Sequence, residues 1–67
     1  MNIDYANVIL QLRVKLNMSQ QAMAKFLGVS FASISRWERG KYDPTKLVKI
    51  RLIELAKEND IKLEEKK

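Results

Sequence analysis

The chain has 67 residues, which is enough for one compact domain but not for a separate substrate-binding domain. It contains no cysteine and no histidine, which excludes disulfides, Cys/His zinc sites, thiol chemistry and the commonest general base. The formal net charge is +5, with nine basic and three acidic residues up to Ile53 and four basic and five acidic residues after it, which favours a polyanionic partner such as nucleic acid or an anionic membrane.

Four helix starts are marked by residues that can cap a helix N-terminus. Their side-chain oxygens can accept a hydrogen bond from a free backbone N–H of the first turn. The residue before each cap and the residue four positions after it are apolar. This is the spacing of a hydrophobic staple, a contact between two apolar side chains that fixes how the chain enters a helix. The caps are Asp4, Ser19, Ser30 and Asp43, and the staples are Ile3 with Val8, Met18 with Met23, Val29 with Ile34, and Tyr42 with Leu47.

The helix ends agree with these starts. Asn17, Gly28 and Gly40 stand where a residue of left-handed conformation would terminate the first three helices. Pro44 suits the first position of a fourth helix, where a missing N–H has no cost, and it excludes helical geometry at Asp43. We therefore predict an all-α fold of four helices, at about 5 to 16, 20 to 27, 31 to 39 and 44 to 58.

Apolar residues at helical spacing predict the core. The first helix carries one stripe and the fourth helix another, with further apolar residues between them. The predicted core residues are Ile9, Leu12, Leu16, Met23, Ala24, Leu27, Val29, Ile34, Trp37, Leu47, Ile50, Ile53 and Leu55. The last segment, NDIKLEEKK, alternates Ile61 and Leu63 with charges. We consider a short strand and a flexible tail for it, and expect residues 1–58 to form the domain and 59–67 a flexible charged tail.

The segment Ser19 to Gly40, SQQAMAKFLGVSFASISRWERG, joins two short capped helices through a single glycine. This arrangement is typical of a helix-turn-helix, in which the second helix protrudes far enough to enter a DNA groove. A helix of nine residues has one buried and one exposed face. With Ile34 and Trp37 directed inward, the outward side chains are Phe31, Ala32, Ser35, Arg36 and Arg39, with Ser33 at the boundary.

From Ile9 to Pro44 the chain resembles the Cro and phage-repressor type of helix-turn-helix regulator, the Xre-like family. The resemblance is carried by the small residue Ala24, the turn residue Gly28, the apolar Ile34 and Trp37, and by Gln20, Trp37-Glu38-Arg39 and Gly40-Lys41. It implies a compact, lambda-repressor-like domain in which the second and third helices form the helix-turn-helix. After Gly40 the chain departs from the phage repressors, which usually have two further helices, the last forming the dimer interface. One long helix follows here, as in small regulators and antitoxins.

The family also implies a largely buried ion pair between Arg13 and Glu38. The alternative is that the two residues are independent surface charges. Family positions imply that Phe31, Ala32, Ser33 and Arg36 approach DNA bases. An arginine commonly donates to guanine, and an exposed phenylalanine can contact a thymine methyl group. For Phe31 the alternative is folding back onto its own domain, and for Arg36 it is a phosphate contact or a solvated charge.

Phosphate contacts position such a domain without selecting sequence. Gln20 occupies the position of the family's phosphate clamp at a helix N-terminus. The DNA backbone on either side of the recognition helix, the helix predicted at 31 to 39 that enters the groove, can be reached by Ser30, Arg39, Lys41 and Tyr42. If roughly five phosphates are neutralised, log K should fall against log salt with a slope near −4 to −5.

The sequence thus predicts a transcriptional regulator that binds double-stranded DNA and acts as a repressor, as a homodimer on a two-fold site. The alternative is an antitoxin, which binds both DNA and a toxin. An enzyme is not expected, because Ser33 and Ser35 have no histidine to activate them, and no cofactor or metal is implied.

No apolar run approaches the about 20 residues of a membrane span, and a basic signal-peptide region is absent. We expect a soluble, cytoplasmic, nucleoid-associated protein, the alternative being a helix 44 to 58 that lies on a membrane surface.

Overall fold

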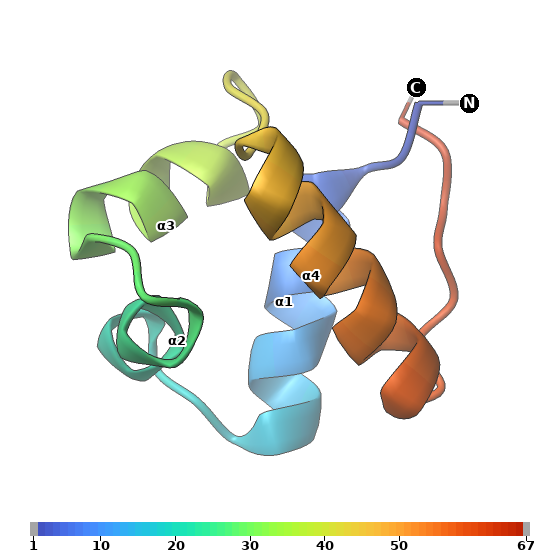
Figure 1. Ribbon diagram of the computed structural model, residues 1–67, viewed down its shortest axis with the longest axis horizontal. Helices are drawn as coiled ribbons and strands as arrows, with labels where there is room; N and C mark the ends of the chain where they lie inside the picture. Colours follow the sequence, from blue (N-terminus) through green and yellow to red (C-terminus); the bar gives the residue numbers. More distant parts are fainter. Residues whose placement is uncertain (1, 67) are drawn as a thin grey trace.

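The computed structural model describes residues 2–66 as an all-α fold of four helices. These are α1 (Tyr5–Leu16), α2 (Gln20–Leu27), α3 (Phe31–Glu38) and α4 (Lys46–Glu58). Helix α1 packs against both α3 and α4, and α2 packs against α3. In Figure 1, α2 and α3 lie on one side of α1, and α4 lies on its other side. Helix α1 therefore connects the helix pair α2 and α3 to α4. The predicted all-α class and four-helix architecture are confirmed.

Three of the four predicted helix starts are confirmed by cap hydrogen bonds. Asp4 accepts from the backbone N–H of Asn7 at 3.2 Å, Ser19 from Ala22 at 3.0 Å, and Ser30 from Ser33 at 3.1 Å. Each cap therefore satisfies a backbone donor that the helix itself leaves free.

The ends of the first two helices also match the sequence prediction. Asn17 and Gly28 adopt left-handed φ values of 55° and 72°. Helix α3 ends at Glu38, one residue before the predicted boundary, with Arg39 in right-handed geometry. Gly40 then takes φ of 80°, which reverses the chain into the loop that leads to α4.

The predicted start of the fourth helix is wrong. Helix α4 begins at Lys46 with Thr45 as its N-cap, and Pro44 lies before the helix in a buried position. Asp43 makes no cap, because its carboxylate pairs with Lys49 at 3.5 Å and approaches Lys66 at 3.8 Å. The predicted staple between Tyr42 and Leu47 is absent as well, since these side chains are 60% and 80% exposed.

The apolar stripe predicted on the fourth helix is also partly wrong. Leu47 and Ile50 face outward, whereas Leu52, Leu55 and Ala56 are buried. The buried residues recur at the spacing of one helical face, and the exposed pair occupies the other side of the same helix. The sequence of α4 carries two apolar rows, and packing against α1 selects the one that includes Leu52.

The remaining core follows the prediction closely. It is contributed by all four helices and by the segment after α4, and its largest fully buried side chains belong to α1, α2, α3 and α4. Most of the predicted positions of α1, α2 and α3 are buried or half-buried. The buried residues are Tyr5, Val8, Ile9, Leu12, Met23, Ala24, Ile34, Trp37, Leu52, Leu55, Ala56 and Ile61.

The segment after α4 runs back along the N-terminal residues, which differs from the expected flexible tail (Figure 1). Ile61 is buried and Leu63 packs against the core. An isolated antiparallel bridge joins Ile3 to Glu65, and the backbone N–H of Asp4 donates to Glu64 at 2.8 Å. Burial of these two apolar side chains holds the segment against the domain. The high charge content of the segment had favoured the prediction of a flexible tail. Lys67 lies outside the described residues, and the domain boundary at residue 58 stays a prediction.

Candidate nucleic-acid interface

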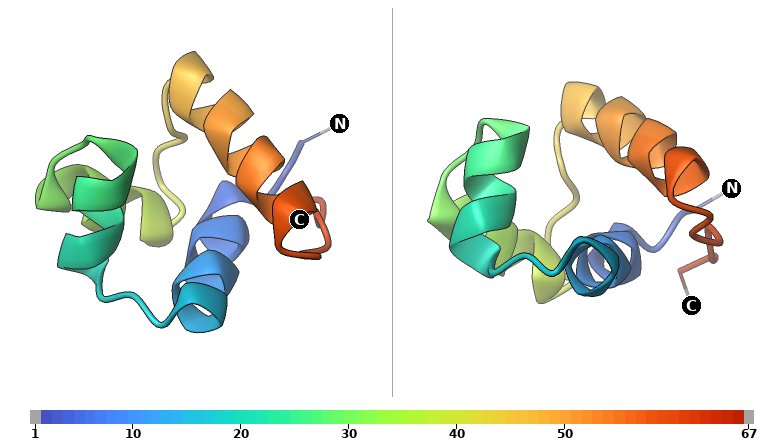
Figure 2. Two further views of the ribbon diagram at one scale, coloured as in Figure 1. Left: turned by 60° about the horizontal axis from the view of Figure 1, so that its bottom comes forward. Right: turned by 90° about the horizontal axis from the view of Figure 1, so that it is seen from below.

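The helix-turn-helix is formed by α2, the turn at Gly28 and α3 (Figure 2). The backbone N–H of Val29 donates to Ala24 at 2.9 Å, and that of Gly28 donates to Lys25 at 3.2 Å. These bonds satisfy carbonyl groups at the end of α2 and set the direction in which α3 leaves the turn. Ile34 is fully buried, so α3 is held to the core by one face while its other face is free.

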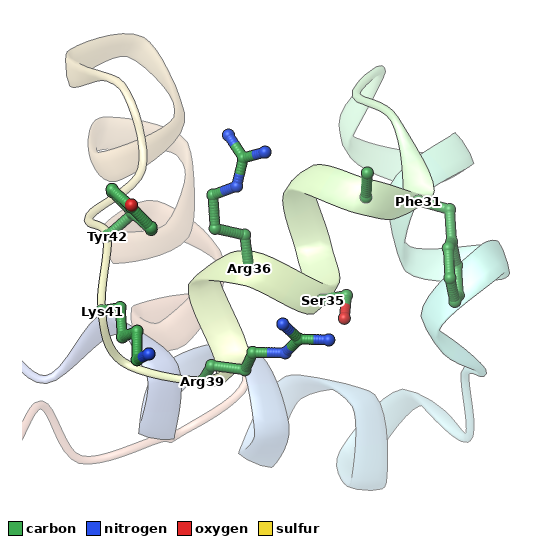
Figure 3. Close-up of a pocket in the computed structure, with 7 residues that line it drawn as sticks. Phe31, Ser35, Arg36, Arg39, Lys41 and Tyr42 are labelled. Atoms are coloured by element: carbon green, nitrogen blue, oxygen red, sulfur yellow. The ribbon is translucent and has the colours of Figure 1, made fainter.

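The free face of α3 and the loop that follows it form a concave surface, shown in Figure 3. It combines cationic side chains with apolar ones over a short distance. We call it the α3 surface, and it is lined by Phe31, Ala32, Ser35, Arg36, Arg39, Lys41 and Tyr42. Among residues 2–66, the salt bridges involve none of its three cations. Such a surface can attract a polyanion and offer it both donors and apolar contacts.

Most of the residues predicted to approach bases lie on this surface. Phe31 is 49% exposed, and Ala32 and Arg36 are exposed as well. Phe31 is therefore not folded back into the core, although half of its area is covered. Ser33 is half-buried and does not line the surface. Its hydroxyl bonds to that of Ser30 at 2.9 Å, and its backbone N–H donates to the Ser30 hydroxyl at 3.1 Å.

Ser35 lines the α3 surface, although it was not among the predicted contact residues. Helical spacing predicts that Ser35 faces outward together with Ala32 and Arg39, and it lines the surface with them. The family positions imply Ser33 as a contact residue and leave out Ser35.

Two of the predicted phosphate-contacting residues, Lys41 and Tyr42, come from the loop after α3. The guanidinium carbon of Arg36 lies 5.4 Å from the centroid of the Tyr42 ring, within the range of a cation–π contact. Arg39 and Lys41 are exposed at the end of the helix and the start of the loop. Figure 3 shows Lys41 and Tyr42 on the loop beside the end of α3, with Arg36 extending to one side of the helix and Arg39 toward Ser35, and all four line the α3 surface.

The structure contains the ion pair between Arg13 of α1 and Glu38 of α3. Nη1 of Arg13 lies 2.9 Å and 3.0 Å from the two carboxylate oxygens, and Nε donates to the carbonyl of Met18 at 3.2 Å. The two side chains are 23% and 14% exposed. The pair therefore connects the start of the helix-turn-helix and the end of the recognition helix to α1, which fixes the direction of α3.

Gln20 takes part in this network and does not lie on the α3 surface. Its amide Nε2 donates to Oε1 of Glu38 at 2.9 Å, and the side chain is half-buried. A phosphate contact by Gln20 would therefore use the backbone N–H at the start of α2 or the second amide hydrogen. Ser30 lies at the start of α3, on the other side of the turn, and is exposed.

No cluster of three acidic, histidine or cysteine side chains suited to a metal ion occurs among residues 2–66. Within the same range, no helix is both long enough and apolar enough to cross a bilayer.

Comparison with known proteins identifies the family. A family model described as helix-turn-helix, of the Xre/Cro-like type, matches residues 9–66, from the second turn of α1 to the segment after α4. No curated protein and no solved structure matches the chain. The family consists of DNA-binding transcription regulators and is not typically enzymatic. The matched range covers most of the chain and includes both helices of the motif and the ion pair, and the chain therefore belongs to the Xre/Cro-like helix-turn-helix family.

Proposed function

We propose that this protein is a sequence-specific transcriptional regulator that inserts α3 into the major groove of DNA and represses by occluding a promoter. The observation that carries the proposal is the α3 surface, where the cations Arg36, Arg39 and Lys41 line the same concavity as an apolar strip of Phe31 and Ala32 and form no salt bridge within the described chain. The free cations can contact phosphates and guanine, and the apolar strip can contact thymine methyl groups.

Base contacts are assigned to the outward face of α3, from its first residue to its last turn. Arg36 carries the donors for guanine, and Phe31 and Ala32 offer apolar contact. The hydroxyl of Ser33 already bonds to that of Ser30, which leaves it fewer free sites for a base contact. The backbone contacts are assigned to Arg39, Lys41 and Tyr42, with Gln20 and Ser30 at the helix starts.

Selection of bound duplexes from a random DNA pool tests sequence specificity. We expect an enriched motif that contains a guanine, and we expect Arg36→Ala to lose the preference for that base. Affinity for the enriched duplex should fall with salt with a slope near −4 to −5, roughly 0.9 for each of about five phosphates. A pool without any enriched motif, together with a flat salt dependence, would reject the proposal.

A single copy of α3 contacts few base pairs, so useful specificity favours a homodimer on a two-fold site. The selected motif distinguishes the two states. A palindrome with half-sites about one helical turn apart supports the dimer, whereas a single short motif supports a monomer.

A second candidate is an antitoxin, which would bind a toxin as well as DNA. It is favoured by the exposed apolar side chains on α4, since Leu47 is 80% and Ile50 is 48% exposed outside the α3 surface. Affinity purification of the full chain from its native cells tests it. Recovery of a protein encoded by a neighbouring gene, lost on Leu47→Asp, supports this function, and recovery of DNA alone contradicts it.

A further inference from the structure

The contact between Arg36 and Tyr42 joins a helix residue to a loop residue on the α3 surface. Arg36 lies in the last turn of α3, and Tyr42 lies four residues after the helix ends, with 5.4 Å between the guanidinium carbon and the ring centroid. Figure 3 shows the guanidinium group extending from the helix on the side where the Tyr42 ring stands. Both side chains are exposed, so the contact is made at the surface where DNA is proposed to bind.

The loop that carries Tyr42 is attached to the rest of the fold on both sides of this residue. Before it, the backbone N–H of Gly40 donates to Trp37 at 3.1 Å, and the Gly40 carbonyl accepts from Nζ of Lys66 at 3.2 Å. After it, Asp43 pairs with Lys49, and Pro44 is buried. The backbone on either side of Tyr42 is thus anchored, and the ring presents a supported face.

A contact through an aromatic face leaves the donors of an arginine available. The N–H groups of a guanidinium lie in its own plane, so a guanidinium whose flat face stacks on a ring keeps them free for another acceptor. An arginine restrained in this way loses less rotamer freedom when it binds, and it can still donate to the O6 and N7 atoms of guanine.

We propose that Tyr42 is a positioning residue that holds Arg36 in the conformation that recognises guanine. The inference rests on the proposed function, and it assigns the specificity effect to the aromatic ring of Tyr42 and not to its hydroxyl, the group suited to a phosphate contact. Sequence preference at one base pair therefore depends on a side chain that does not touch the base.

Two substitutions separate the ring from the hydroxyl. Tyr42→Phe keeps the ring and removes the hydroxyl, whereas Tyr42→Leu removes both and keeps an apolar side chain. The loop position is 60% exposed, so neither variant should disturb the core, which thermal unfolding by circular dichroism verifies. Any phosphate contact of the hydroxyl is lost equally in the two variants, which makes them a matched pair.

The measurement is the ratio of affinities of the full chain for the selected duplex and for the same duplex with the guanine replaced by 7-deazaguanine, which lacks the N7 acceptor. We expect the wild type and Tyr42→Phe to show the same ratio. Tyr42→Leu should lower it by a factor of about two to five, the range of an exposed cation–π contact. In an Arg36→Ala background the ratio should be close to one, and adding Tyr42→Leu should not change it.

The free protein provides a readout that needs no DNA. The Arg36 side-chain protons should be shifted upfield by the ring in the wild type and in Tyr42→Phe, and should return to ordinary shifts in Tyr42→Leu.

Three results would overturn the inference. They are a Tyr42→Leu ratio equal to that of the wild type, a Tyr42→Phe ratio as low as that of Tyr42→Leu, and a wild-type preference that does not depend on Arg36. In each of these cases specific DNA binding survives. If no motif is enriched and affinity does not respond to salt, the proposed function itself fails, and the inference fails with it.

Discussion

Replacement of Arg13 by alanine should lower the stability of the domain more than any other change of a surface charge. In the structure, Arg13 satisfies both oxygens of Glu38 and the carbonyl of Met18. The substitution leaves Glu38, which is 14% exposed, with Gln20 as its remaining side-chain donor. Breaking a buried ion pair costs about 3 to 5 kcal/mol, and partial exposure reduces the expected loss here to about 2 to 4 kcal/mol.

The loss is large relative to the stability of so small a domain. A 67-residue protein has a free energy of unfolding of roughly 3 to 10 kcal/mol. A change of 1 kcal/mol shifts the melting temperature of such a domain by about 4 to 8 °C, so the Arg13→Ala variant should melt at least about 8 °C below the wild type. Circular dichroism at 222 nm, with urea unfolding as a second measurement, gives both the melting temperature and the free energy.

Lys15→Ala is the matched control, since it removes an exposed cation from the same helix and should change the free energy by about 0.5 kcal/mol or less. A double-mutant cycle with Glu38→Ala isolates the interaction of the pair. If Arg13→Ala melts within 2 °C of the wild type (roughly 0.5 kcal/mol or less), the ion pair does not hold α3 in place and the physical argument is wrong.

Four further substitutions test the turn, the packing of α4 and of the segment after it, and the DNA backbone contacts. Gly28→Ala should cost about 1 to 2 kcal/mol through backbone strain alone, because φ is +72° and no atom lies within 4 Å of the added Cβ; an unchanged urea midpoint would contradict this. Ile61→Ala should cost about 2 to 4 kcal/mol and Leu47→Ala less than about 0.5 kcal/mol, and the reverse order in thermal unfolding would show that the packing of α4 is misassigned. Lys41→Ala should weaken binding to selected and random duplexes equally and reduce the salt slope by about 0.9; an effect confined to the selected duplex would place Lys41 at a base.

The caps and turns of the first three helices could be predicted from sequence because they depend on local chemistry. Ser19 and Ser30 act within three residues of themselves, and Gly28 is needed for the backbone angle of a single turn. Ile34 and Trp37 occupy the one face of a short helix that can be buried. The boundaries and the turn of the helix-turn-helix could therefore be predicted from interactions close in the chain, whereas the direction of α3 also depends on the distant pair of Arg13 and Glu38.

The fourth helix could not be predicted to the same accuracy because its position depends on distant residues. Asp43 has the chemistry of a cap, but its partners Lys49 and Lys66 come from α4 and from the end of the described chain. The choice between the apolar row of Leu47 and that of Leu52 is made by packing against α1. Periodicity shows that a helix has an apolar face, and it does not show which of two faces meets the core.

The site was predicted in part for the same reasons. The outward direction of Phe31 and Arg36 followed from helical spacing, whereas the involvement of Gln20 with Glu38 required the tertiary structure. The contact of Arg36 with Tyr42 likewise crosses from the helix to a loop whose path depends on Gly40 and its partners.

Titration of the isotope-labelled full chain with the selected duplex, followed by NMR, tests the assignment of the DNA-binding surface most directly. We predict that the largest shift changes map to residues 30–42, and that the side-chain Nε–H of Arg36 is among them. The exposed residues Leu47 and Ile50 of α4, which lie outside the α3 surface, should change less than residues 30–42. Changes centred on α4, with residues 30–42 unaffected, would contradict the proposal that α3 enters the DNA groove.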